Sequence, residues 1–348
     1  MAAVETTTIE AAGAAPAVSH HHQQPPIVCP GHVRPLAEVH FSGETPDGVF
    51  LISACLDGSP MLRDGATGDW IGTFAGHKGA VWSAKVDAEA RLAATGSGDF
   101  SAKLWDAVTG KCVATLSHGH VVKSVDISGN RATLATAGHE GVVRLFDVAT
   151  ASDVPVRELA VGAQLAKCCW ADSDLVVAGA SDGSIRVWDT RGPACVVDFA
   201  LEGGPIMDIE LKTAGGRPTM TACCGDVVAV YDAKTWTPRT RVAAPVHFRE
   251  EGGASLAPSG DRLVLGGGRH GGSRQGALGV EKGATRVGDV GSDLTVFAVD
   301  LEGNVVHERK GHCGPVRCVR FHPSGATVAT GSEDGTIRIW PIKNATAD

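Results

Sequence analysis

Two cysteines, two histidines and two acidic residues lie close together in the segment GHCGPVRCVRFHPSGATVATGSEDGTIRIW, residues 311–340. Cysteine and histidine are the side chains that zinc prefers, and a histidine beside an acid and a hydroxyl could act as a general base toward a nucleophile. The segment therefore has the residue types for a metal centre or a catalytic site. The choice depends on whether the pattern occurs once. The six residues are Cys313, Cys318, His312, His322, Glu333 and Asp334.

The pattern is repeated along the chain. Short strand-like segments that end in an aromatic residue and an aspartate recur as KLWD, RLFD, RVWD and AVYD, with a last copy RIWP and weaker copies MLRD and FAVD. The successive copies are 42, 41, 42, 43, 68 and 41 residues apart. A period of roughly 40 to 45 residues is typical of four-stranded units that stack around an axis. Seven such units predict an all-β, seven-bladed propeller.

From residue 27 onward the chain resembles the WD-repeat family, which carries Gly-His and Trp-Asp pairs at this spacing. The resemblance implies that a strand from about residues 26–30 closes the ring by pairing in the last blade. We expect a disordered leader at 1–25, the propeller at 26–343 and a tail at 344–348. The 68-residue step predicts a Gly-rich insertion at about 267–290, between the second and third strands of blade six.

The same resemblance implies that the recurring polar residues are structural tetrads. In each tetrad the tryptophan N–H bonds a threonine, which bonds a histidine, which bonds an aspartate; a buried tryptophan and histidine need such partners. A catalytic dyad is the alternative, but catalysis gives no reason to copy the group into several blades. The two tetrads are His77, Thr95, Asp99 and Trp105 in blade two, and His312, Thr330, Asp334 and Trp340 in blade seven.

These assignments leave no residues for a metal, a cofactor or catalysis. His312 belongs to a tetrad, and Cys318 takes the position of the small inward-facing residues Ala84 and Cys168. A propeller enzyme would need acids or histidines that converge in the central channel outside the blade register, and we expect none. The sequence therefore predicts no catalytic residue, no metal site and no cofactor.

A partner-binding face is predicted from a break in strand alternation. Val81 and Ala84 both have inward-facing character although three residues separate them, which indicates a β-bulge. By resemblance to the family, the intervening residue lies on the top face of the ring. The alternative for the blade-two residue is that its side chain folds back over its own blade. The candidate partner-binding residues at this position are Trp82, Lys123, Met207 and Arg317; Ala37, Ala166 and Gly252 are their equivalents.

One stretch is more specific than the repeat. Residues 41–87, with FLISACLDG, PMLR, TGDWIGTF and GHKGAVW, resemble the family of serine/threonine kinase receptor-associated proteins. The resemblance implies a non-enzymatic scaffold with protein partners: Gemin proteins of the SMN complex in spliceosomal snRNP assembly and mRNA processing, the RNA-binding protein unr, and receptor kinases. Subunit i of translation initiation factor three, which shares GHxGAVW, is the alternative, and a propeller enzyme a distant one.

Composition and charge limit the kinds of partner and the cellular compartment that we expect for this protein. A formal net charge of -8 argues against direct nucleic-acid binding by bulk charge, and no apolar run reaches the roughly 18 to 20 residues that span a bilayer. The N-terminus, which lacks Lys and Arg, is wrong for a secretory signal. Ten cysteines without a CxxC motif indicate reduced thiols. We expect a cytoplasmic and nuclear protein, with the propeller itself a monomer within a larger complex.

Overall fold

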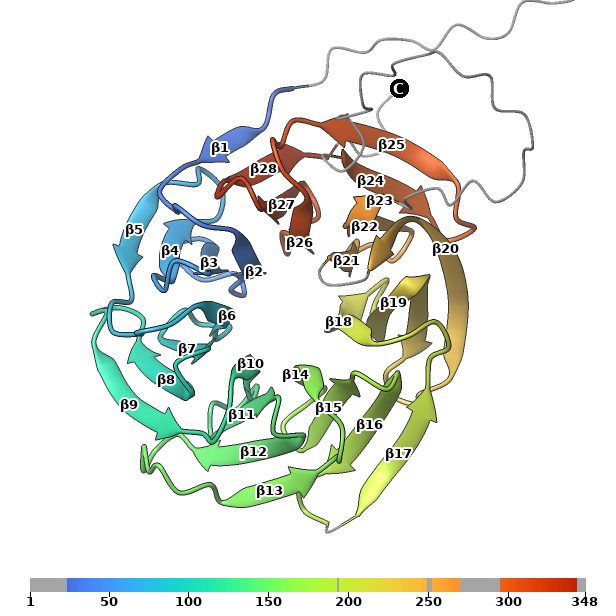
Figure 1. Cartoon of the computed structure of the whole chain (residues 1–348). Coiled ribbons are helices and arrows are strands. Elements are labelled where there is room, and N and C mark those ends of the chain that lie inside the picture. The colour runs from blue at the N-terminus through green and yellow to red at the C-terminus, as the bar shows by residue number, and fades with distance from the viewer. Residues whose placement is uncertain (1–23, 193, 249–251, 270–294, 343–348) are drawn as a thin grey trace, which may run out of the picture.

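The computed structural model describes residues 24–192, 194–248, 252–269 and 295–342. Over these residues the chain forms strands and no helix. The strands make seven four-stranded antiparallel sheets, which stand as blades around a central channel (Figure 1). The predicted all-β, seven-bladed propeller is therefore confirmed. The expected insertion from residue 270 and the tail from residue 344 lie outside the described residues, as does the leader except for residues 24 and 25.

Blades one to four each run from an inner strand at the channel to an outer strand at the rim. Their strands, in chain order, are β2 (Leu36–Phe41), β3 (Phe50–Cys55), β4 (Met61–Asp64) and β5 (Trp70–Thr73) in blade one; β6 (Val81–Val86), β7 (Leu92–Ser97), β8 (Ser101–Asp106) and β9 (Cys112–Ser117) in blade two; β10 (Val122–Ile127), β11 (Thr133–Gly138), β12 (Val142–Asp147) and β13 (Arg157–Ala160) in blade three; and β14 (Leu165–Trp170), β15 (Leu175–Ala180), β16 (Ser184–Asp189) and β17 (Cys195–Ala200) in blade four.

Blade five departs from this plan. The first half of β19 pairs with β18 and its second half, from Gly225, pairs with β20. The single element β19 therefore supplies both the second and the third strand positions of this blade. Gly225 has a φ of 57°, which a glycine adopts without strain. A short strand, β23, adds to the outer edge of this blade. The elements are β18 (Ile206–Ala214), β19 (Arg217–Asp232), β20 (Pro238–Phe248) and β23 (Gly268–Arg269).

The ring is closed by the N-terminal strand. β1 pairs antiparallel with β28, with Ile27 opposite Ile339 and Cys29 opposite Ile337, as predicted from the segment before Gly31. This pairing covers the edge of β28 that would otherwise be open to another chain. Blade six holds β21 (Gly253–Leu256), β22 (Arg262–Gly266), β24 (Thr295–Asp300) and β25 (Val305–Lys310); blade seven holds β26 (Val316–Phe321), β27 (Thr327–Ser332), β28 (Ile337–Pro341) and β1 (Ile27–Cys29).

The hydrophobic core is divided among the junctions between blades. Each buried apolar cluster of the described residues draws its members from two neighbouring blades; Trp105 of blade two, for example, packs with Ile52 and Leu62 of blade one. The junction between blades seven and one is filled in the same way, by Leu36 against Ile337 and their neighbours. Because no blade can bury its faces alone, the fold depends on the whole ring.

The recurring aspartate has a local role. The Oδ1 atom of Asp106 accepts hydrogen bonds from the backbone N–H groups of Val108 and Thr109, at 3.0 and 2.8 Å. Asp64 and Asp232 hold the equivalent turns of blades one and five. Each aspartate thus satisfies the backbone donors of the turn between the third and fourth strands.

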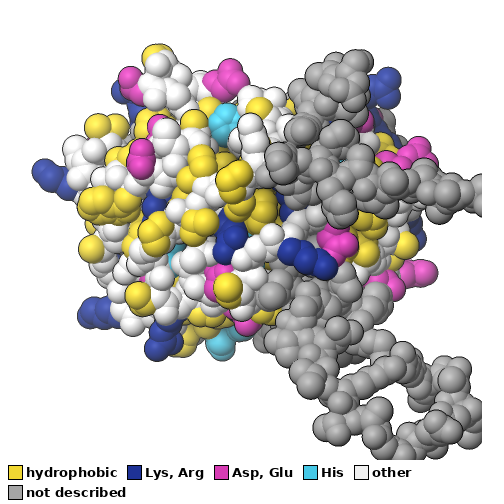
Figure 2. All heavy atoms as spheres, turned by 90° about the horizontal axis from the view of Figure 1, so that it is seen from above, with side chains coloured by type: hydrophobic (Ala, Val, Ile, Leu, Met, Phe, Trp, Pro, Cys, Tyr) yellow, Lys and Arg dark blue, Asp and Glu magenta, His cyan; other side chains and the backbone are white. Residues whose placement is uncertain are grey.

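The rim carries apolar surface in addition to charged side chains. The edge of the ring seen in Figure 2 shows hydrophobic side chains across its centre. Of the outer-strand residues, Trp70 of β5 is 61% exposed and Val28 of β1 is 48% exposed. In the part of the chain that the structure describes, no helix is long and apolar enough to cross a membrane.

Candidate partner-binding site

The tetrad residues of blades two and seven lie in continuous hydrogen-bonded chains. In blade two, Trp105 Nε1 donates to Thr95 Oγ1 at 2.8 Å, Thr95 Oγ1 lies 2.7 Å from His77 Nε2, and His77 Nδ1 lies 2.9 Å from Asp99. In blade seven, the corresponding three distances for Trp340, Thr330, His312 and Asp334 are 2.8, 2.7 and 3.1 Å. The carboxylates of Asp99 and Asp334 can only accept, so each histidine carries its proton on Nδ1 and accepts at Nε2 from the threonine hydroxyl, as the neutral Nδ1–H tautomer.

The environment favours this protonation state. Burial lowers the pKa of His77 and of His312, and the facing carboxylates offset that effect only in part. Burial alone would raise the pKa of Asp99, but hydrogen bonds from Ser101, the Lys78 N–H and His77 lower it to about 2. Both histidine nitrogens are occupied and the rings are inaccessible to solvent. These groups connect the strands of a blade and are not placed to act on a substrate.

The buried histidines make stability depend on pH. Burial lowers the pKa values of His32, His40, His77, His118 and His312 below 6.5. Below pH 6.5 the unfolded chain therefore binds more protons than the folded one, each such histidine contributing at most about 1.4 kcal/mol per pH unit. We expect the free energy of unfolding, measured with urea, to fall by about 1 to 2 kcal/mol between pH 7.5 and 6.0.

The predicted decrease in the free energy of unfolding is limited to the interval above pH 6, because the protonation of one group below that pH has the opposite effect on stability. Burial raises the pKa of Asp126 to about 6, so the folded chain takes up a proton there as the pH falls further. The His77→Gln variant should show a shallower decrease between pH 7.5 and 6.0 than the unchanged chain. A flat profile across that interval would contradict the assigned neutral histidines.

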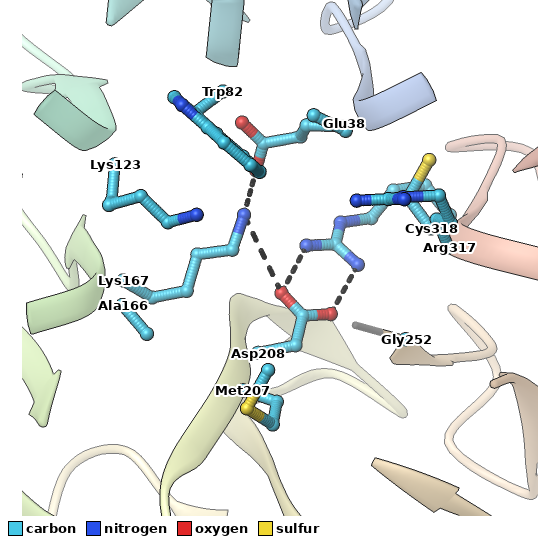
Figure 3. Close-up of a pocket in the computed structure, with 12 residues that line it drawn as sticks. Glu38, Trp82, Lys123, Ala166, Lys167, Met207, Asp208, Gly252, Arg317 and Cys318 are labelled. Atoms are coloured by element: carbon cyan, nitrogen blue, oxygen red, sulfur yellow. Dashed lines mark hydrogen bonds and ion pairs between the residues drawn. The ribbon is translucent and has the colours of Figure 1, made fainter. Parts of the chain in front are cut away.

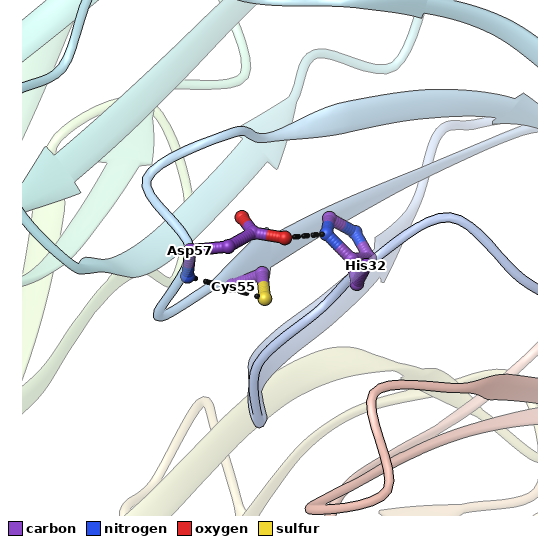
Figure 4. A group of neighbouring side chains, drawn as sticks. All are labelled: His32, Cys55 and Asp57. Carbon is purple, nitrogen blue, oxygen red and sulfur yellow. Dashed lines mark hydrogen bonds and ion pairs between the residues drawn. The ribbon is translucent and has the colours of Figure 1, made fainter.

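A third histidine network, which the sequence analysis did not predict, lies in blade one (Figure 4). His32 contacts Asp57 at 2.9 Å and Ser53 at 2.8 Å. Arg63 stands where a tryptophan would be and donates to the carbonyl oxygens of Gly68 and Pro30 instead. The signal was present, since His32 and Asp57 are in register, but a serine and an arginine replaced the expected residues.

This network includes the only group of three potential metal ligands close together among the described residues: His32, Cys55 and Asp57. The Cys55 Sγ donates to the Arg34 carbonyl and accepts from the Asp57 N–H. Ser97 and Ser332 make the equivalent two contacts in blades two and seven. Cys55 is thus the blade-one copy of a structural serine, and the histidine has no nitrogen left for an ion.

The remaining blades retain less of the network. In blade three, His118 and not His120 contacts Thr136, at 2.8 Å, but its other nitrogen lies against the Leu116 carbonyl. Glu140, at the aspartate position, pairs with Arg144. His118 therefore occupies the histidine position of blade three, and the loss of the acid contact follows from the arginine.

The cysteines and histidines of residues 311–340 do not lie together in the structure. Cys318 is buried, with burial raising its thiol pKa to about 12, whereas Cys313 is exposed and His322 contacts Ser324 in a separate turn. All ten cysteines are free thiols. Neither a zinc site nor a disulfide exists in this segment.

The predicted bulge occurs in six inner strands. The pairing register shifts between Val81 and Ser83, so that Trp82 is the extra residue, and equivalent shifts occur in blades one, three, four, five and seven. In blade six the inner strand begins only at Gly253, and the Gly252 N–H bonds the Arg317 carbonyl instead. The bulge rotates one residue of each inner strand out of the core alternation.

All seven residues at this position surround one hollow at the mouth of the channel (Figure 3). We call this side of the ring the top face. The Lys123 Nζ atom lies 3.2 Å from the centroid of the Trp82 ring, so Trp82 is covered by the next blade's lysine. Arg317 lies 3.2 Å from Glu333. The full lining is Ala37, Glu38, Trp82, Lys123, Ala166, Lys167, Met207, Asp208, Gly252, Arg317, Cys318 and Arg320.

The floor of the hollow is a network of ion pairs that the sequence analysis missed. Lys167 Nζ lies 2.6 Å from Glu38, across the channel. Arg320 donates twice to Asp208, each at 2.7 Å. Burial alone would raise the pKa of Glu38, but the ammonium groups of Lys167 and Lys85 lower it. These acids stand in the blade register, so they do not contradict the expectation that no acids or histidines outside that register converge in the channel.

A closed ring with structural tetrads and one lined hollow on its top face defines a protein-interaction propeller of the WD-repeat class. The family model described as WD domain, G-beta repeat matches residues 68–106, 110–147, 164–189 and 303–341. The chain is 38% identical to the serine-threonine kinase receptor-associated protein of Gallus gallus over 90% of this chain and 82% of that protein.

Two further relatives align with most of the chain. The Dictyostelium discoideum serine-threonine kinase receptor-associated protein is 37% identical over 90% of this chain and 98% of its own length. Eukaryotic translation initiation factor 3 subunit I of Culex quinquefasciatus is 30% identical over 90% of this chain and 95% of its own length. The chain belongs to the WD-repeat family and, by its higher identity, groups there with the serine-threonine kinase receptor-associated proteins.

Proposed function

We propose that this protein is a non-enzymatic scaffold that binds partner proteins through the hollow on its top face. The observation that carries the proposal is the Lys123–Trp82 pair at the channel mouth, where an aromatic side chain and a cation remain partly accessible. Tryptophan and arginine are the residue types that dominate binding energy at protein interfaces, and Met207 adds an adaptable apolar contact. The polar groups that would otherwise suggest catalysis are engaged in the tetrads and channel ion pairs.

The resemblance to the receptor-associated proteins suggests which complexes are involved. We propose partners in spliceosomal snRNP assembly, namely Gemin proteins of the SMN complex, together with unr and, where the organism has them, receptor kinases. This role places the protein in the cytoplasm and nucleus, as one propeller within a larger complex. The proposed domain division remains a leader at 1–25, a propeller at 26–343 that includes the blade-six insertion, and a tail at 344–348.

A role in the translation initiation machinery is the second candidate, because the chain also aligns with nearly the whole length of initiation factor 3 subunit I. Cross-linking mass spectrometry of the native complex separates the two roles. Cross-links to SMN-complex proteins would support snRNP assembly, and cross-links to initiation-factor subunits would replace it with the second role.

The top-face proposal is tested with single substitutions. Trp82→Ala and Arg317→Ala are each expected to lower the affinity for the principal partner at least about 10-fold, as for interface residues that contribute more than 1.4 kcal/mol. The readouts are quantitative co-purification from native cells and the thermal midpoint of the purified variant. The matched controls are Trp70→Ala on the exposed rim and Arg191→Ala, whose side chain is 70% exposed.

We expect both controls to retain all partners and the two top-face variants to remain folded. If folded Trp82→Ala and Arg317→Ala proteins keep every partner at normal levels, the top face is not the binding surface. If Trp70→Ala alone loses partners, the rim and not the top face is the binding surface.

A further inference from the structure

We propose that the top-face hollow binds the carboxylate of an aspartate or glutamate in an extended acidic segment of the partner, with Lys123 as its counter-ion beside Trp82. This inference rests on the proposed function, because it assumes that the top face meets a partner, and it adds the chemistry of the residue that enters. Nothing in the sequence pattern indicated this, since the relevant charges come from different blades.

The hollow is basic although the protein is acidic. Among the residues that line it, four carry positive charge and two carry negative charge, whereas the whole chain has a formal net charge of -8. A local potential of this sign favours an anion at the mouth of the channel. The four cations are Lys123, Lys167, Arg317 and Arg320, and the two acids are Glu38 and Asp208.

The two acids are already engaged by the deeper cations. Glu38 accepts from Lys167 and from the Ser83 hydroxyl, both at 2.6 Å. Asp208 is held by both terminal nitrogens of Arg320. Figure 3 draws the bonds of Lys167 to Glu38 and of the Arg320 guanidinium to Asp208, while the Lys123 ammonium points into the hollow with no dashed line to a carboxylate. Within the described part of the chain, its close contact is the face of Trp82.

The surroundings of Lys123 disfavour the charged form of its side chain. Burial lowers the pKa of Lys123 to about 8, and the positive charges of Lys167 and Arg317 add to the effect. Burial lowers the pKa of His139, and the charge of Lys123 lowers it further. A carboxylate that entered between these groups would neutralise the repulsion and raise the lysine pKa again.

The dimensions and floor of the hollow favour a carboxylate on a peptide. Its volume, about 550 Å³ including the solvent at its open side, accommodates a side chain with adjoining backbone. A phosphate dianion would bring twice the charge toward Glu38 and Asp208. A single-stranded nucleic acid would need an uncovered aromatic face for base stacking, but Lys123 occupies the face of Trp82.

The test uses the full chain and defined peptides. The probes are the end-capped pentapeptides Gly-Ala-Glu-Ala-Gly, its Gln counterpart and its phosphoserine counterpart, with a uridine octanucleotide as the nucleic-acid probe. Binding is followed by NMR at the Trp82 indole N–H, assigned by Trp82→Phe, and at the Lys123 side-chain carbon next to Nζ, assigned by Lys123→Met. Lys111→Met, which removes an exposed lysine, is the matched control.

We expect a saturable shift with the Glu peptide, at least 10-fold weaker binding of the Gln peptide, and loss of the shift in Lys123→Met but not in Lys111→Met. Saturation should raise the Lys123 pKa, so that affinity falls as the pH is raised through 8. Equal binding of the Glu and Gln peptides, or an unchanged Lys123 titration, overturns the proposal. Tighter binding of the phosphoserine peptide or of the oligonucleotide also overturns it, in favour of that ligand.

The outcome is separable from that of the proposed function. If Trp82→Ala loses its cellular partner while the Glu peptide does not bind, the face is an interface of other chemistry. If the Glu peptide binds but both top-face variants keep their partners, the hollow is an anion site away from the main interface.

Discussion

Replacing Arg320 by methionine is expected to lower the free energy of unfolding by about 3 to 5 kcal/mol, which is typical when one partner of a buried ion pair is removed. Arg320 makes two 2.7 Å hydrogen bonds to Asp208, and both residues are at most 5% exposed. Without the guanidinium, the nearest charge for Asp208 is Lys167 at 4.0 Å. The variant leaves a buried carboxylate whose desolvation is no longer compensated.

Urea unfolding at pH 7.5 measures this effect. The double variant Arg320→Met/Asp208→Leu is expected to recover most of the loss, since replacing both members of a buried pair by apolar residues is often neutral. Arg191→Met removes an arginine from an exposed pair and should leave the urea midpoint nearly unchanged, because solvent screens exposed ion pairs. A double variant as unstable as Arg320→Met would show that the arginine acts through packing and not through its charge.

Replacing Thr330 by valine should cost about 2 to 4 kcal/mol in blade seven, because one hydroxyl serves two buried groups. It accepts from Trp340 Nε1 at 2.8 Å and contacts His312 Nε2 at 2.7 Å. Valine has nearly the same shape, so the change isolates the hydrogen bonds. A buried polar group left without a partner costs about 1 to 3 kcal/mol.

The matched variant is Thr136→Val in blade three. There Phe146 stands at the tryptophan position and has no N–H, so that within the described residues the Thr136 hydroxyl has one side-chain hydrogen bond, to His118. We expect a loss of about 1 to 2 kcal/mol, roughly half that in blade seven, measured by urea unfolding of both variants. Equal losses would mean that the tryptophan N–H does not depend on the threonine, and the tetrad would reduce to a histidine contact.

The sequence by itself determined the repeating structure of the blades. Spacing of 22 residues from His77 to Asp99 and 10 from Thr95 to Trp105 recurs in blade seven, because both blades satisfy the same hydrogen bonds over short loops. The bulge was also readable, since Val81 and Ala84 break strand alternation, and six inner strands show it. Closure by the N-terminal segment followed from the incomplete last blade.

Substituted positions within the repeat were harder to interpret. The blade-one network uses Ser53 for threonine, Cys55 for serine and Arg63 for tryptophan, so that a pattern search for the usual residues passes over it. Each replacement supplies the hydrogen bond by other chemistry, which becomes clear only when the partner atoms have positions.

Only the tertiary structure decided what the channel and the top face contain. Glu38 and Lys167 are 129 residues apart, and Asp208 and Arg320 are 112 residues apart, yet both pairs meet across the axis. The repeat specifies which position of an inner strand faces the channel, but the partner across it depends on how many blades close the ring and on the length of each side chain. The basic hollow around Lys123 arises in the same way, because charges from separate blades converge only after closure.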